Sequence, residues 1–220
     1  MANEEKVIFR SLAGSAENGV TSWPMRRMRH PLFLWMGLRP VFAQHTEEED
    51  RALAKWSLKR RQLVEIGVAE GASAFALREA MDGAGTLYLI DPFHLSRVHW
   101  INAARHAAAA AVCKSHNGAV VWIRKFSWEA VRNWSQKIDF LFIDGDHEEK
   151  AVRRDWDEWS VFVAPGGCVA FHDARVFEGG WPRANDGPVR VVNGLFRETP
   201  LPGWEIVDEV HSLVIVRRSA

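Results

Sequence analysis

Hydrophobic and polar positions alternate between two kinds of segment over most of the chain beyond about residue 60. Short apolar runs, of the length typical of buried strands, are separated by longer stretches with the polar spacing of helices. The five runs are Gln62–Ala69, Thr86–Phe93, Ala119–Phe126, Ile138–Asp146 and Gly166–Asp173. Strands that alternate with helices form parallel crossover units, so the pattern predicts an α/β fold with a doubly wound, mostly parallel sheet.

The remaining elements follow from the same pattern. Helices are predicted at Ser73–Met81, Arg97–Lys114, Ser127–Gln136 and Glu148–Val163. After a loop rich in glycine and proline, a short helix near 189–197 precedes two apolar runs that are joined almost without a break. Strands joined so closely pair antiparallel. We therefore expect seven strands, of which the last is antiparallel.

The first sixty residues have a different pattern, which predicts two parts: an N-terminal helical cap or oligomerisation segment (1–60) and the doubly wound domain (61–220). Trp23–Pro40 mixes basic and aromatic residues, and its prolines interrupt any long amphipathic helix. This favours a cap or a contact in a homo-oligomer over a membrane anchor. Four acidic residues directly after Thr46 mark the first turn of a capped helix that extends to Lys59.

Composition and charge mainly exclude certain partners and locations for the protein. The chain has 28 basic and 28 acidic residues, which disfavours nucleic acid as a partner because phosphate binding needs a basic surface. No apolar run reaches the roughly 18 residues that cross a bilayer, and the first residues, MANEEKVIF, lack the pattern of a secretory signal. Two cysteines in apolar segments favour free thiols. We therefore expect a cytoplasmic protein without a membrane partner.

Residues that carry chemistry gather where the predicted strands end. The first strand runs into Gly67 and Gly71, a turn that lets a ligand approach the backbone, and Ser73 is placed to cap the next helix. Glu65 before this turn suits a ligand with a cationic end and does not suit a pyrophosphate. Asp91 ends the second strand, where a carboxylate accepts hydrogen bonds from ribose in doubly wound folds. These features point to S-adenosylmethionine as the cofactor.

The motifs, taken together, resemble those of class I S-adenosylmethionine-dependent methyltransferases. In order they are VEIGVAEGAS, LYLIDPF, Ser127–Trp128, FLFIDGDH and APGGCVAFHD. The nearest branch contains small-molecule O-methyltransferases, including macrolide-sugar and catechol-type enzymes that use a divalent metal. The resemblance extends over about residues 62–218. It implies a Rossmann-like, S-adenosylmethionine-binding domain with strand order 3-2-1-4-5-7-6 that methylates a hydroxyl of a small-molecule acceptor.

The resemblance also implies roles for individual residues. Glu65 and Gly67 would line the methionine end of the cofactor, Asp91 the ribose, and Ser127 with Trp128 the adenine. For Trp128, packing in the core is an alternative reading. The full set of implied cofactor-binding residues is Glu65, Gly67, Gly71, Ser73, Asp91, Ser127, Trp128 and Asp144.

Asp144 and Asp173 follow the fourth and fifth strands, which should lie beside the first. Ligands in open α/β sheets bind outside the carboxyl ends of strands, so both carboxylates should face one crevice. With His172 they would hold a divalent metal such as magnesium or manganese, while Asp144 and His147 would serve catalysis, His147 as proton acceptor. His172 departs from the family pattern, which has Glu-Asp or Asp-Asn here. Imidazole favours softer ions than magnesium, so either the metal differs or His172 is a base and no metal binds.

Two alternatives remain open at this point. A metallohydrolase would hold two metals for attack by water, although the cofactor series would then be unexplained. A non-catalytic module that keeps the fold is the other. The hydrolase would use Asp144, Asp146, His147, His172 and Asp173. Asp146 is otherwise expected to cap the next helix, and Asp155 and Asp157 to lie on a solvated helix face.

Overall fold

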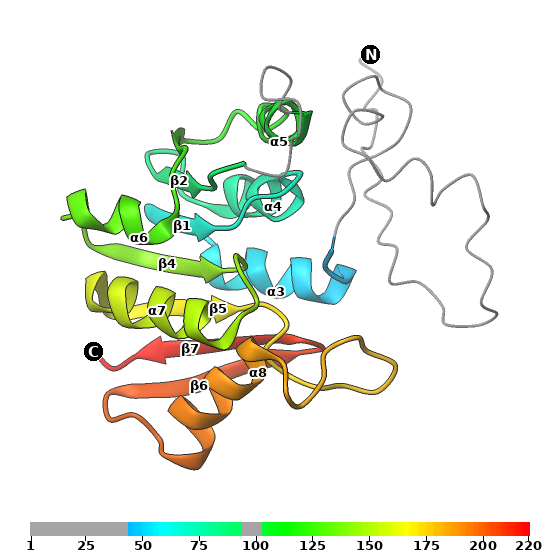
Figure 1. Ribbon diagram of the computed structural model, residues 1–220. Coiled ribbons are helices and arrows are strands. Elements are labelled where there is room, and N and C mark those ends of the chain that lie inside the picture. The colour runs from blue at the N-terminus through cyan, green and yellow to red at the C-terminus, as the bar shows by residue number, and fades with distance from the viewer. Residues whose placement is uncertain (1–43, 94–102) are drawn as a thin grey trace, which may run out of the picture.

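The computed structural model describes residues 44–93 and 103–220, which form one seven-stranded sheet between two layers of helices (Figure 1). The strands are β1 (Gln62–Ile66), β2 (Thr86–Ile90), β3 (Ala119–Ile123), β4 (Ile138–Ile143), β5 (Val163–Phe171), β6 (Trp204–Val210) and β7 (Leu213–Arg218). Their order is β3-β2-β1-β4-β5-β7-β6. The first five strands are parallel, and β7 is antiparallel to both β5 and β6. The predicted fold class is confirmed.

Helices occupy both faces of the sheet. They are α3 (Glu47–Ser57), α4 (Ala72–Ala80), α5 (Ala103–Val112), α6 (Ser127–Ala130), α7 (Glu149–Trp159) and α8 (Gly187–Val192). Short 3₁₀ turns follow α6 and α7, and a π-helical turn, Asn193–Glu198, follows α8. No helix in residues 44–93 or 103–220 combines the length and the apolar composition that a membrane span requires.

Two hydrophobic cores result, because successive side chains of a strand point to opposite faces. On one face, Leu63 of β1 belongs to a core with Leu53 of α3 and Leu77 of α4. On the other, Val64 of β1 belongs to a core with Trp156 of α7 and Val192 of α8. The inner strands β1, β2, β4 and β7 are therefore buried along most of their length, which explains why they appear in the sequence as nearly continuous apolar runs. The edge strands β3 and β6 are partly exposed.

Most predicted elements are present, with different ends. The helix capped by Thr46 is confirmed: the Thr46 hydroxyl accepts from the Glu49 N–H (3.2 Å), and the Thr46 N–H donates to the Glu49 carboxylate (2.8 Å). The prediction that Ser73 caps the next helix is wrong, since the N-cap of α4 is Gly71 in a left-handed conformation. The helix predicted at Ser127–Gln136 is a single turn, α6, with a 3₁₀ turn after it. The basic, aromatic segment 23–40 lies outside the described residues.

Parallel pairing brings the ends of the five parallel strands to one edge of the sheet. Ile66 pairs with Ile143, and Ile143 pairs with Phe171, so the residues that follow them lie at one level. The ladder continues past the strands: the Asp144 N–H donates to the Ile66 carbonyl (2.9 Å), and the His172 N–H to the Ile143 carbonyl (3.1 Å). The residues that the sequence singles out are therefore neighbours in space.

Gly67 is required at this edge for two reasons. Its φ of +86° is a left-handed conformation, and a Cβ there would lie 2.0 Å from the Asp144 carbonyl oxygen. A side chain is thus excluded by strain and by contact with backbone, which cannot swing away. Gly203 has a similar φ of +82° but nothing within 4 Å of the position of a Cβ.

Gly67→Ala should therefore destabilise the protein by about 4 kcal/mol or more, whereas Gly203→Ala should cost only the left-handed backbone term of about 1–2 kcal/mol. Urea unfolding of the two variants measures the difference. An equal loss of unfolding free energy in both variants would contradict this prediction, because the backbone at Asp144 would then have moved to make room for the added methyl group.

Candidate functional site

A pocket of about 840 Å³ opens at this edge of the sheet. Its size is within the range of pockets that hold cofactors and other small ligands. The turns after β1, β2, β3 and β4 form its walls, and α7 closes one side. Of the predicted residues, it is lined by Gly67, Asp91, Ser127, Trp128, Asp144 and His147.

Asp91 lines the pocket with a carboxylate that the backbone holds in place. One oxygen accepts hydrogen bonds from the N–H groups of Val68 (2.9 Å) and Ala69 (3.2 Å), and the other accepts from Phe93 (2.6 Å). The carboxylate thereby fixes the turn after β1. The oxygen bonded to Phe93 keeps a lone pair with which it can accept from a ligand hydroxyl.

Glu65, Gly71 and Ser73 do not line the large pocket. The Glu65 side chain is fully buried beneath the turn, and the Ser73 hydroxyl donates a hydrogen bond to it. Burial raises the pKa of Glu65 well above its usual value, against the effect of that hydrogen bond. Gly71 and Ser73 line a small adjoining cavity of about 20 Å³ together with His45. These three predicted residues therefore lie behind the pocket wall.

Trp128 is half-buried on the pocket wall and belongs to neither hydrophobic core. Phe126 stacks on it with ring centroids 5.5 Å apart and an interplanar angle of 13°. The guanidinium groups of Arg132 and Arg154 lie over its ring, 5.5 and 5.0 Å from the centroid. The position of Trp128 thus agrees with the prediction that it lines a pocket, and not with the alternative that it packs in the core.

Asp155 is buried, so the prediction that it lies on a solvated helix face is wrong. Its side chain accepts a hydrogen bond of 2.5 Å from the Ser127 hydroxyl at the pocket wall. Burial raises the pKa of Asp155 to about 6, and the bond from Ser127 acts in the opposite direction. The signal was present in the sequence, because Val152, Asp155 and Trp156 have the spacing of one helix face. Asp157 is exposed as predicted and pairs with Arg153.

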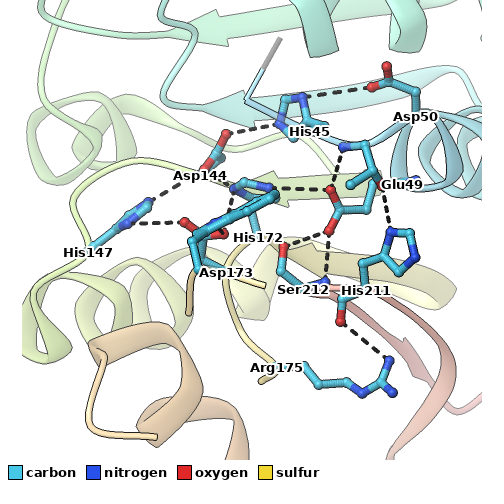
Figure 2. A network of polar contacts seen from close by, with 12 residues as sticks. His45, Glu49, Asp50, Asp144, His147, His172, Asp173, Arg175, His211 and Ser212 are labelled. Atoms are coloured by element: carbon cyan, nitrogen blue, oxygen red, sulfur yellow. Dashed lines mark hydrogen bonds and ion pairs between the residues drawn. The ribbon is translucent and has the colours of Figure 1, made fainter. Parts of the chain in front are cut away.

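Asp144 lies at the centre of a group of imidazoles (Figure 2). Its Oδ1 is 3.0 Å from His172 Nδ1 and 3.6 Å from His147 Nε2, and its Oδ2 is 3.3 Å from His45 Nε2. Burial by itself would raise the pKa of Asp144. The surrounding imidazoles, His172 first, outweigh burial and hold this pKa well below its usual value.

His172 and its second carboxylate partner, Glu49, are both buried. Glu49 Oε2 lies 3.8 Å from His172 Nε2, and Oε1 accepts from the N–H (2.8 Å) and hydroxyl (2.6 Å) of Ser212. Burial opposes ionisation of Glu49, but these partners lower its pKa to about 2. Burial by itself would lower the pKa of His172. The neighbouring carboxylates outweigh burial and raise this pKa well above its usual value. Sequence reasoning took Glu49 only as part of an acidic first helical turn.

His45 is a further residue that sequence reasoning missed. It lies directly before the N-cap of α3, and its ring packs against those of Phe142 and His172, with centroids 5.8 and 4.5 Å away. Its Nδ1 is 3.7 Å from Asp50 Oδ1. Within the described part of the chain, His45, Asp144 and His172 form a group whose ligand atoms all lie within 4.8 Å of one another.

Asp173 lies beside this group, with Oδ1 3.5 Å from His172 Nδ1. Its Oδ1 accepts a 2.5 Å hydrogen bond from Trp181 Nε1, and its Oδ2 lies 3.5 Å from His147 Nδ1. Asp146 accepts a hydrogen bond of 2.9 Å from the Glu148 N–H, and Glu148, not Asp146, is the N-cap of α7. Asp146 therefore stabilises the turn before the helix.

Comparisons with known proteins show the family and the fold. A family model described as a methyltransferase domain matches residues 64–174, from β1 to the residues just after β5. Solved structures with a similar fold include the O-methyltransferase TomG from Streptomyces achromogenes in complex with SAM. It is 14% identical, covering 86% of this chain and 88% of that chain, with a TM-score of 0.60.

Two more solved structures are similar over most of the chain. One is the O-methyltransferase from Bacillus cereus in complex with SAH, 16% identical over 88% of this chain and 91% of that chain, with a TM-score of 0.60. The other is cofactor-bound Rv0187 from MTB, 13% identical over 90% of this chain and 91% of that chain, with a TM-score of 0.61. At these identities the likeness shows the fold.

The raised pKa of Asp155 predicts a pH-dependent stability. The folded chain binds this proton more tightly than the unfolded chain, so the associated stability is complete below about pH 4 and is lost as pH rises through about 6. Asp155→Asn removes the titration and should stabilise the protein near pH 8 by up to about 3 kcal/mol, with little difference near pH 4. Urea unfolding at the two pH values measures this.

Asp157→Asn, on the exposed face of the same helix, is the matched control and should change stability by less than about 0.5 kcal/mol. An Asp155→Asn variant that is less stable than the parent near pH 8 would contradict the prediction. The hydrogen bond from Ser127 to the ionised carboxylate would then outweigh the cost of burial.

Proposed function

The chain belongs to the methyltransferase-domain family, and we propose that it transfers the methyl group of S-adenosylmethionine to an oxygen atom of a small molecule. The observation that carries the proposal is that two kinds of residues line one pocket. Asp91 and Trp128 line its wall, and Asp144 and His147 line the part next to the imidazole group. The comparisons do not support the metallohydrolase alternative.

The residues present fit the cofactor. The pocket has room for a nucleoside with an amino-acid tail, and Gly67, which has no side chain, lines it and would let the tail approach the backbone. We assign the adenine to the wall formed by Ser127 and Trp128, since an indole face stacks on a base. Asp91 would accept from the ribose hydroxyls. The names of two neighbours, in complex with SAM and SAH, support this assignment.

Glu65, Gly71 and Ser73 would act on the cofactor from behind the turn. Their contacts keep the turn after β1 in its shape, and Gly71 packs closely against α5, where a Cβ would lie 3.0 Å from Ala108 Cα. Gly67, which lies in this turn, lines the pocket. Their proposed role is therefore to hold the binding surface in place.

The proton acceptor in this proposal is His147. When bound, S-adenosylmethionine supplies a methyl group on a sulfonium, so the acceptor oxygen has to be positioned and relieved of its proton. The His147 side chain is 46% exposed and lines the pocket beside Asp144. His172, in contrast, is 2% exposed and does not line the pocket. Of the two imidazoles, only His147 is therefore placed to meet an acceptor hydroxyl.

A divalent cation held by Asp144 and His172 is part of the proposal. The donor set fits a cation, because a carboxylate and an imidazole converge there from the ends of β4 and β5. A cation at this position would lower the pKa of the acceptor hydroxyl. Asp144, at the pocket wall, would orient it toward the acceptor.

The acceptor is proposed to be a small molecule bearing a hydroxyl group, as the names of the two O-methyltransferase neighbours suggest. The division at about residue 60, the homo-oligomer and the cytoplasmic location stay predictions. The residues on which the oligomer prediction depends, 23–40, lie outside the described part of the chain.

Trp128→Ala should weaken binding of S-adenosylmethionine by about 1–3 kcal/mol, the range for stacking of a base on an aromatic ring. Titration calorimetry measures the affinity. Trp181→Ala is the matched control: Trp181 is 40% exposed and lies outside the pocket wall, so its loss should leave the affinity unchanged. No measurable binding to the unmodified protein would refute the proposed cofactor.

His147→Ala should lower the rate of methyl transfer by about 10²–10⁴-fold, the usual contribution of a general base. Formation of S-adenosylhomocysteine with a panel of small hydroxyl compounds measures the rate, while calorimetry should show unchanged cofactor affinity. The exposed His116 provides the control substitution. Methyl transfer to amines but to no hydroxyl compound would refute the proposal of oxygen as the acceptor atom.

A further inference from the structure

We infer that His45, Asp144 and His172 form a binding site for a divalent transition-metal ion. In this site His45 replaces Asp173, the ligand that the sequence suggested. The inference rests on the proposed function for its catalytic meaning, since it names the ion and the ligands of the same site. Metal binding itself can be measured without cofactor or acceptor, so the two can fail separately.

The two distances between Asp144 and the imidazoles have values that a shared ion allows, and all three ligand atoms lie within 4.8 Å of one another. Two ligands each about 2.0–2.2 Å from one ion, at angles of about 90–110°, lie roughly 3.0–3.5 Å apart. His172 Nδ1 is 3.0 Å from one oxygen of Asp144, and His45 Nε2 is 3.3 Å from the other. The three residues come from the start of α3 and the ends of β4 and β5, and they face one another (Figure 2).

Each imidazole also has a carboxylate behind it. His172 Nε2 faces Glu49 Oε2 at 3.8 Å, and His45 Nδ1 faces Asp50 Oδ1 at 3.7 Å. A metal-binding histidine commonly directs its outer ring nitrogen to a carboxylate, which fixes the ring and the tautomer. Both carboxylates belong to the first turn of α3 and lie just beyond hydrogen-bond distance of the two rings, so their placement agrees with a metal site.

The ligand types select the class of ion. Magnesium and calcium prefer oxygen ligands, whereas two imidazoles with one carboxylate suit manganese, iron, cobalt or zinc. Asp173 Oδ1 lies 3.5 Å from His172 Nδ1 but already accepts a hydrogen bond from Trp181, and its other oxygen faces His147. The proposed ligand set therefore takes His45 in place of Asp173. His45 and Asp144 both line the 20 Å³ cavity beside the large pocket, and a cavity of this size has room for about one water molecule as a further ligand.

The competing interpretation is a metal-free network in which a protonated His172 lies between Asp144 and Glu49. Both interpretations place a carboxylate at each ring nitrogen of His172. They differ at His45 and in their response to metals. A proton network needs no ion, whereas the metal site should bind one ion per chain with His45 as a ligand.

The test is titration of the chelator-treated full-length protein with Co²⁺, Mn²⁺ and Mg²⁺, followed by calorimetry and, for Co²⁺, by visible absorption. We expect one Co²⁺ or Mn²⁺ per chain and binding of Mg²⁺ at least about tenfold weaker. His45→Ala should weaken Co²⁺ binding by more than about 100-fold, and Glu49→Gln by about 10–100-fold. Asp173→Asn should change it by less than about threefold.

His116→Ala is the control for His45→Ala, and thermal unfolding identifies any variant that does not fold. If Glu49→Gln does not fold, Asp50→Asn tests the outer carboxylates in its place, with an expected loss of about tenfold or more. Absence of Co²⁺ and Mn²⁺ binding would overturn the inference. So would a Co²⁺ affinity that falls with Asp173→Asn and not with His45→Ala. Cofactor binding that persists in a protein without metal affinity would leave the proposed function in place.

Discussion

The arrangement of the site depends on the contacts of one buried carboxylate, that of Glu49. Moving an ionised group out of water costs several kcal/mol unless charged and hydrogen-bonding partners compensate. Glu49 has such partners in three places: the N-terminal end of α3, Ser212 in the turn between β6 and β7, and His172 after β5. Because each partner lies on a different element, satisfying this one group fixes the position of α3 and of the last two strands relative to the sheet edge.

This constraint explains why elements far from the pocket wall matter to the chemistry. Strands β6 and β7 contribute no residue to the large pocket, yet the turn between them holds Glu49, and Glu49 faces the imidazole of His172. His172 in turn contacts Asp144, which does line the pocket. The antiparallel end of the sheet is thus connected to the site through a short series of charged and polar groups.

The pocket itself combines two different environments. Near Trp128, the Phe126 ring and the Arg154 guanidinium lie against the indole, and the Ser127 hydroxyl donates to the buried Asp155. Elsewhere on the pocket wall, imidazoles converge on Asp144. Parallel pairing of the strands brings the two environments together, since it aligns the turns after β1 to β4 along one edge. In the proposed function a base stacks on the Trp128 part of the wall, while proton transfer and ion binding take place near Asp144.

The sequence by itself determined the strands and the placement of Gly67, Asp91 and Asp144 at one edge, because strand–helix alternation is a local, repeating pattern. The order of the strands followed from the resemblance to class I methyltransferases. Only the tertiary structure decided that His45 and Glu49 join the site. The contacts of His45 with Asp144 and of Glu49 with Ser212 join residues 99 and 163 positions apart. Such contacts leave no periodic signal, since the burial and pairing of a polar side chain depend on which distant segment packs against it.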